Sequence, residues 1–343
     1  MYYMSEIYNY LVIQFSFFKN PSHGLFIGYI FIAVIISLIY GCVKNRTVNI
    51  VKSCGYLFKI HFRDNISYID DIKVFVIDKL VLGFFYTFLF GVAFFFKEKT
   101  NELMHFVGLF STSNNATLTT MILYSLGAII VFDFSTFIEH YMSHKFKFLW
   151  EFHKVHHVPQ NLNPITAYRS HPVNQGLFVT ISGVLTGVYS GIVSSFYPDT
   201  QLSLVFAGQN VFMFIFLMFG LNLQHSHVQI RYPIIIRDIF VSPEYHQTHH
   251  SIAEEHHDKN FGFLFSFWDR IFGTQIHLHS DKRLRFGVKG INYEEYSGVI
   301  NHYVTPFVKV FIVKNTRERK YIILIHKCRY SELRARINFV NAM

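Results

Sequence analysis

Five long apolar segments constrain the fold of this chain more than any other feature. They cover residues 24–43, 80–96, 116–137, 176–196 and 202–221. Each approaches about 20 residues, the length that an α-helix needs to cross a bilayer. Only 15% of all residues are charged, against roughly 25% in a typical soluble domain. We therefore predict an all-α, multi-pass membrane bundle of about five spans.

Basic residues in the loops predict how this bundle lies in the membrane. Residues 44–79 contain seven Lys or Arg, whereas the turn at 197–201 contains none. Because cytoplasmic loops are enriched in Lys and Arg, we expect the N-terminus outside and the C-terminus in the cytoplasm. The histidine clusters described below then lie on the cytoplasmic face, of the ER membrane in a eukaryote or of the inner membrane in a bacterium. The net charge of +9 is typical of such basic loops, and we expect no nucleic-acid partner.

The chain divides into three predicted regions. Residues 1–114 hold two spans and a basic cytoplasmic loop, residues 115–290 form a catalytic domain, and residues 291–343 form a basic tail to which we assign no role. The three cysteines are scattered and form no C-x-x-C motif. They therefore indicate neither a disulfide framework nor a thiolate metal site.

Histidine spacing is the strongest functional signal. The chain has 20 histidines, and eight of them lie in three tight clusters, one H-x-x-x-H and two copies of H-x-x-H-H. On a helix, residues three or four apart share one face, so each cluster presents several imidazoles to a common point. These eight candidate metal ligands are His140, His144, His153, His156, His157, His246, His249 and His250.

The number and type of these ligands indicate how many metal ions are bound and which elements are possible. Eight imidazoles are too many for a single ion, so we expect a centre of two metals. The first cluster, HYMSH, lacks the glutamate of the H-E-x-x-H metalloprotease motif, because Tyr141 stands in its place. Imidazole binds zinc, copper, iron and nickel alike. The spacing therefore leaves a redox-active iron pair and a zinc pair both open.

Several longer stretches carry a family resemblance. These are DFSTFIEHYMSH at 133–144, RSHPVN at 169–174, NLQHSHV at 222–228, SPEYHQTHHS at 242–251 and HHDKNFGFLFSFWDRIFGT at 256–274. Together they resemble the motifs of the fatty acid hydroxylase/sterol desaturase superfamily, over about residues 115 to 290. The resemblance implies a helical histidine-box domain that caps the membrane bundle and holds two iron ions.

This sequence departs from the family pattern at four positions. Phe137 stands where Tyr is frequent, Tyr141 where Arg is common, Asn174 where Glu often follows the His-Pro pair, and Phe261 where Tyr is usual. None of these positions is a histidine of the clusters. The departures therefore leave the expected metal ligands in place, but they could alter the choice of substrate or the residues that support the ligands.

The resemblance also extends the list of site residues. It implies that His225 is a ninth ligand, and it makes His171 and His227 weaker candidates. A ligating imidazole usually donates its other N–H to a carboxylate or a carbonyl. The carboxylates expected to support the ligands in this way are Asp133, Glu139, Asp258 and Asp269. We further interpret Trp268-Asp269-Arg270 as an Asp–Arg pair that holds the final loop.

The implied activity is oxidation of a lipid C–H bond with O2, either hydroxylation or desaturation of a sterol, a fatty acyl chain or a related lipid. Electrons would come from a separate donor, of the cytochrome b5 or ferredoxin type with its reductase, since His171-Pro172-Val173 is not the H-P-G-G of a fused cytochrome b5. The expected partners are this donor, the substrate and the membrane lipids. Two alternatives are a catalytically silent metal-binding scaffold and, with less support, a zinc-dependent membrane protein or transporter.

Overall fold

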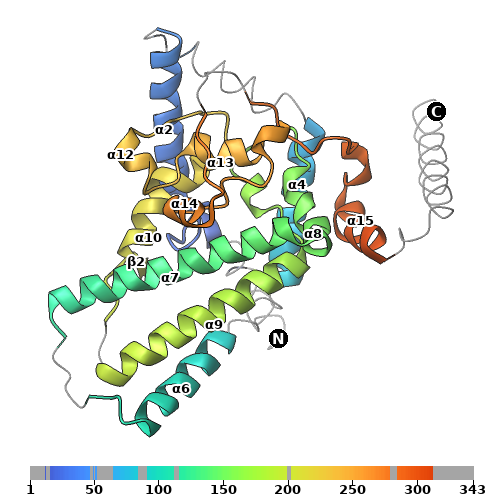
Figure 1. Ribbon diagram of the computed structural model, residues 1–343. Helices are drawn as coiled ribbons and strands as arrows, with labels where there is room; N and C mark the ends of the chain where they lie inside the picture. Colours follow the sequence, from blue (N-terminus) through green and yellow to red (C-terminus); the bar gives the residue numbers. More distant parts are fainter. Residues whose placement is uncertain are drawn as a thin grey trace, which may run out of the picture.

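The protein is mostly helical in the computed structural model (Figure 1), which describes residues 16–46, 65–83, 91–111, 116–198, 202–278 and 284–311, and residues 12, 49 and 51. Its longer helices are α2 (Ile27–Lys44), α4 (Asn65–Ile77), α6 (Gly91–Phe106), α7 (Leu118–Lys145), α8 (Lys147–His157), α9 (Pro172–Phe196) and α15 (Val299–Phe311). The shorter helices are α10 (Val211–Phe216), α11 (Asn222–Gln224), α12 (Ile234–Arg237), α13 (Pro243–His249) and α14 (Phe267–Phe272). Single turns are η1 (Ser16–Phe18), η2 (Asp78–Leu82), η3 (Thr166–Tyr168), η4 (Leu217–Leu221), η5 (Glu254–His256) and η6 (Tyr293–Glu295).

Three of these helices, α2, α7 and α9, are long and apolar enough to cross a membrane. They correspond to the first, third and fourth of the five predicted spans. The second predicted span, 80–96, falls partly outside the described residues, because α6 begins at Gly91 and residues 84–90 are not described.

The prediction of a fifth span over 202–221 is wrong. Its first part holds two short antiparallel strands, β1 (Val205–Phe206) and β2 (Gln209–Asn210), in which Val205 faces Asn210 and Phe206 faces Gln209. The turn between them has positive φ at Ala207 and Gly208, a conformation that ends a helix. The apolar helix that follows, Val211–Gln224, is shorter than a membrane span.

Helices α6, α7 and α9 form a layer of long rods (Figure 1), with α9 packed against both of the others. Glycines at every fourth position of α9 face α6. A Cβ atom added at Gly187 would lie 2.5 Å from the carbonyl oxygen of Ala93, and one at Gly191 would lie 2.6 Å from that of Lys97. Small residues at this spacing let two helix backbones approach closely, as is common within membranes.

A smaller group of elements, α13, α14 and their loops, lies along one side of α7, and α8 lies at the C-terminal end of α7 (Figure 1). Asp133, buried in α7, joins this group to the rods. Its carboxylate accepts hydrogen bonds from the backbone N–H groups of Leu264 (2.7 Å) and Phe265 (3.1 Å) and from Nε1 of Trp268 (2.9 Å). The acid in the apolar helix is therefore satisfied by three donors, and it fixes the loop before α14 onto α7.

Part of the predicted C-terminal tail packs onto the predicted catalytic domain. Helix α15 lies against α8, and the fully buried Tyr296 belongs to a small apolar cluster with Val155 and Val158. The remaining tail residues, 312–343, lie outside the described part of the chain. The sequence did not distinguish the apolar face of α15 from the basic tail that follows, so the whole of 291–343 was predicted to be a tail.

Candidate metal centre

Nine histidines converge in two neighbouring groups. The first group contains His140 and His144 from α7, His153 and His157 from α8, and His249 from α13. The second contains His156 from α8, His225 after α11, and His246 and His250 at α13. Within each group the candidate donor nitrogens all lie within 4.8 Å of one another. These nine are the eight clustered histidines together with His225, the ninth that the resemblance implied.

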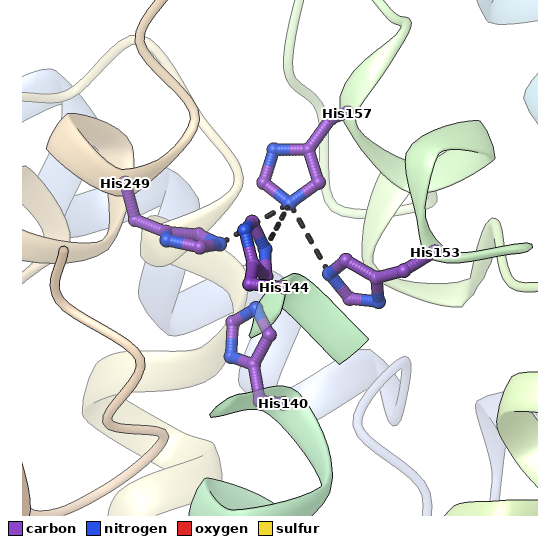
Figure 2. Close-up of side chains that lie close together, drawn as sticks. All are labelled: His140, His144, His153, His157 and His249. Carbon is purple, nitrogen blue, oxygen red and sulfur yellow. Dashed lines mark hydrogen bonds between the residues drawn. The ribbon is translucent and has the colours of Figure 1, made fainter. Parts of the chain in front are cut away.

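In the first group, three close contacts meet at His157, as Figure 2 shows. Its Nε2 lies 3.2 Å from the Nε2 atoms of His144, His153 and His249. An ion held at about 2.0–2.1 Å by each imidazole places neighbouring donor nitrogens about 2.8–3.4 Å apart, depending on the coordination angle. The spacing in this group is therefore that of ligands around one cation.

The second group has the same spacing. The Nε2 atom of His225 lies 3.2 Å from those of His156 and His246, and the Nε2 atom of His250 lies 3.1 Å from that of His246. The two groups are in direct contact, since the rings of His157 and His250 stack with centroids 4.5 Å apart. The arrangement therefore offers two adjacent cation sites.

Backbone carbonyls orient three of these rings. Nδ1 of His140 donates to the carbonyl oxygen of Phe261 (3.0 Å), and Nδ1 of His249 donates to that of Lys259 (2.8 Å). Nδ1 of His156 donates to the carbonyl oxygen of Arg169 (3.3 Å). Because a carbonyl only accepts, Nδ1 carries the proton in each ring and Nε2 is left with a lone pair. These lone pairs point into the groups, which fits a bound cation.

Burial keeps the imidazoles outside the membrane helices neutral. Together with the charge repulsion of neighbouring imidazoles, it lowers the pKa of His156 to about 4 and the pKa of His246 to about 3. The pKa values of His153, His157 and His249 fall well below the usual value for the same reasons. Neutral imidazole is the form that binds a metal. The donor set therefore fits a metal in both charge and geometry.

The four predicted carboxylates have different surroundings. Asp258 lies nearest to a ligand candidate, with Oδ1 3.6 Å from Nδ1 of His144, and it also receives a hydrogen bond from Lys145. Glu139 instead accepts hydrogen bonds from Ser143 and Asn174. Asp133, described above, contacts backbone and tryptophan N–H groups and no imidazole.

Asp269 acts through the backbone. Its carboxylate accepts from the N–H groups of Phe261 (2.8 Å) and Gly262 (2.7 Å) and from the hydroxyl of Thr274 (2.6 Å). The prediction that Asp269 pairs with Arg270 is therefore wrong. The carboxylate of Asp269 is instead surrounded by these three donors. Asp269 thereby holds the chain segment whose carbonyl at Phe261 orients His140.

The two weaker histidine candidates lie outside both groups. His171 caps α9: its Nδ1 accepts from the backbone N–H of Val173 (3.2 Å), and its Nε2 donates to the carbonyl oxygen of Tyr303 (3.1 Å). A capping role accounts for a histidine before Pro172 at a helix start. The ring of His227 faces Phe286, with centroids 6.4 Å apart.

A cavity of about 220 Å³ opens beside the metal centre. It contacts His140 and His153 of the first group and His156, His225 and His246 of the second. The rest of its wall is supplied mainly by α7, α8 and α9 and by two loops. These lining residues are Phe132, Thr136, Glu139, Phe152, Ala167, Ser170, Asn174, Gln175, Phe178, Leu221 and Phe263.

The fold and this site define a class: a helical protein with apolar helices of membrane-spanning length, two groups of histidines that could hold metal ions, and an adjoining cavity. Comparison with known proteins agrees. Residues 125–274 match the family model described as Fatty acid hydroxylase. No solved structure matches the chain.

Three curated relatives are similar over about half of the chain. An alkylglycerol monooxygenase from Caenorhabditis elegans is 27% identical over 43% of this chain and 26% of its own length. A very-long-chain aldehyde decarbonylase from Oryza sativa subsp. indica is 28% identical over 47% of this chain and 58% of its own. An ornithine lipid hydroxylase from Rhizobium tropici is 25% identical over 52% of this chain and 49% of its own. The chain thus matches less than two thirds of each relative.

Several residues that shape the site carry no sequence signal. The carbonyls of Lys259, Phe261 and Arg169 orient ligand candidates, and any residue type supplies a carbonyl. Positive φ at Asp258 and Asn260 marks the tight loop that brings two of these carbonyls into place. Asn260 holds that loop, since its amide donates to the carbonyl oxygens of Tyr245 (3.2 Å) and Ile276 (3.1 Å).

Proposed function

We propose that this protein is a membrane di-iron oxygenase that hydroxylates or desaturates a lipid, using O2 and electrons from a separate donor. The observation that carries the proposal is the position of the cavity. It contacts imidazoles of both histidine groups, so a molecule bound there would lie beside both cation sites. The same cavity is bounded by α7 and α9, two helices long and apolar enough to cross a membrane.

Iron fits the donor set better than a structural zinc. The first group offers five imidazole nitrogens, whereas structural zinc sites almost always use four ligands. Bound iron would supply the redox and oxygen chemistry that protein side chains lack. In the hydroxylation, C–H becomes C–OH, the second oxygen atom leaves as water, and the donor contributes two electrons while solvent contributes two protons.

The protein's own residues would bind and orient the substrate. Phe132 and Phe178 meet edge to face, with ring centroids 5.9 Å apart, and both line the cavity together with Phe152. These rings would exclude water and hold an alkyl chain. The backbone carbonyls at Lys259, Phe261 and Arg169 would keep the imidazoles in the tautomer that binds a metal.

The relatives support this choice of reaction. Two of them are a monooxygenase and a hydroxylase whose names specify alkylglycerol and ornithine lipid. The proposed location is the cytoplasmic face of the ER membrane or of a bacterial inner membrane, on the basis of the loop charges. A cytochrome b5-type or ferredoxin-type donor would dock on that basic face.

Comparative lipidomics tests the proposal. Cells that express the chain should accumulate an oxygen-dependent lipid product, and cells that express His156→Ala should not, although the variant remains in the membrane. His105→Ala serves as the matched control, because His105 stacks on Phe110 and lies in neither group. Equal product from the His156→Ala cells, or no oxygen-dependent product from the unaltered chain, would contradict the proposal.

A further inference from the structure

The cavity beside the metal centre changes from apolar to polar along its length. On α7, its lining residues follow one helix face in the order Phe132, Thr136, Glu139 and His140. On α9, Phe178 lies three residues beyond Gln175 and four beyond Asn174, and these two residues occupy the first turn. The two helices run side by side (Figure 1). The apolar end therefore lies between the membrane helices, and the polar end lies next to the imidazoles.

At the polar end, three side chains form a closed triad. The hydroxyl of Ser143 donates to Oε1 of Glu139 (2.7 Å). The amide nitrogen of Asn174 donates both to the same Oε1 atom and to the hydroxyl oxygen of Ser143 (3.0 Å). Both N–H groups of the Asn174 amide are therefore used, and this pattern fixes which way the amide points.

The triad leaves one buried oxygen atom, Oδ1 of Asn174, without a partner among the described residues. Oε2 of Glu139 receives none of the bonds that reach Oε1. The side chains of Asn174 and Glu139 are only 6% and 7% exposed. A buried acceptor without a donor is costly, and both side chains line the cavity.

We infer that this polar end binds a hydrogen-bond donor on the lipid, a hydroxyl or an amide N–H placed near the carbon that is oxidised. An amide oxygen only accepts, so a ligand that pairs with Oδ1 of Asn174 must donate. Because Glu139 directly precedes His140 in α7, the donor group and the reacting carbon lie close together. The alkyl chain extends toward Phe132 and Phe178. A plain hydrocarbon chain, or an ether without an O–H, leaves Oδ1 of Asn174 unpaired.

This inference rests on the proposed function, since it names the substrate class of the same cavity. It is tested by binding, which needs no turnover. The zinc-loaded full chain in nanodiscs is equilibrated with radiolabelled hexadecan-1-ol, 1-methoxyhexadecane or hexadecane, and binding is corrected for protein-free nanodiscs. Only the alcohol carries a donor. A hydrogen bond to a charged or buried acceptor predicts about tenfold or greater preference for the alcohol over the methyl ether.

Substitutions in the triad test whether it causes the preference for the alcohol. Asn174→Leu and Glu139→Gln should reduce it to about twofold or less, with hexadecane binding unchanged. Thr180→Val is the matched control: its hydroxyl donates to the carbonyl oxygen of Gly176 (2.7 Å) and Thr180 does not line the cavity, so its removal should keep the full preference. Glu139→Gln nearly preserves shape and covers the case in which Asn174→Leu fails to fold.

The outcomes separate the two proposals. Equal binding of the alcohol and the ether, or a preference that survives both triad variants, overturns this inference. If the alcohol is preferred but the iron-loaded chain forms no oxygen-dependent product from any lipid, the inference stands and the proposed function fails. In the active enzyme, oxidation of hexadecan-1-ol near its hydroxyl end supports the inference, and oxidation near the methyl end contradicts it.

Discussion

The carbonyl oxygen of Arg169 accepts a hydrogen bond from Nδ1 of His156, while the guanidinium of the same Arg169 lies 2.9 Å from the carboxylate of Asp71. Both partners of this ion pair are fully buried. Arg169 also donates to the carbonyl oxygen of Val155 (3.0 Å), within α8 itself. The ion pair thus anchors the loop that orients a ligand candidate of the second histidine group.

Removing one partner of this buried pair should destabilise the fold. Asp71→Asn leaves the Arg169 charge without its counter-ion, and such a loss typically costs about 3–5 kcal/mol. Denaturant unfolding in detergent measures it. The exposed Lys99–Glu102 pair, separated by 2.7 Å, is the control, because Lys99→Ala should change stability by less than about 1 kcal/mol. Equal effects of the two substitutions would show that the buried pair is not an anchor.

His225 and His227 provide a matched test of the second histidine group. His225→Ala removes a member of the group and should lower metal occupancy there, leaving about one metal per chain in place of two. His227→Ala removes a histidine two residues away that belongs to neither group, so full occupancy is expected. Metal analysis of both purified variants measures this. If both retain two metals, His225 is not a ligand.

Asp269 should tune metal affinity without touching the metal. Asp269→Asn weakens the hydrogen bonds to the N–H groups of Phe261 and Gly262, and so loosens the carbonyl that orients His140. Substitutions of residues that orient metal ligands typically lower affinity about 10–100-fold, and competition with a chelator measures this. Asp238→Asn, at a half-exposed carboxylate that pairs with Arg237 and His277, should leave affinity unchanged. Unchanged affinity in Asp269→Asn would contradict the expected role.

The contact of α6 with α9 should tolerate no side chain at Gly187. A Cβ there would lie 2.5 Å from the carbonyl oxygen of Ala93 and 2.9 Å from Cβ of Phe96. Gly187→Val should therefore push the helices apart and destabilise the protein by about 1–3 kcal/mol. Gly91→Ala is the control, because no described atom lies within 4 Å of a Cβ at that position. Thermal unfolding of the two variants compares them, and similar midpoints would argue against close packing.

The sequence predicted the parts of this protein that depend on periodicity. The H-x-x-H-H spacing placed His153, His156 and His157 on one helix, and the apolar lengths of α2 and α7 indicated spans. The resemblance added His225. These features could be predicted because a helix repeats every 3.6 residues, so that spacing along the chain becomes direction in space.

Features that depend on tertiary contact could not be predicted in this way. The division of the nine histidines into groups of five and four separates the neighbours His156 and His157, because adjacent residues on a helix point about 100° apart. The expected fifth span failed because apolar content does not distinguish a short β-hairpin from a helix. Asp133 was expected to support an imidazole, yet the nearest donors are the N–H groups of a loop about 130 residues away.

The most direct test of the central claim is the metal content and activity of one preparation. The full chain, loaded anaerobically with ferrous iron in nanodiscs, is analysed for iron and zinc per chain and is then exposed to O2 and a chemical reductant with membrane lipid present. We predict two irons per chain and a lipid product that carries an oxygen atom from labelled O2, or a new double bond formed only when O2 is present. Two zinc ions that iron does not replace, together with no oxygen-dependent product, would contradict it.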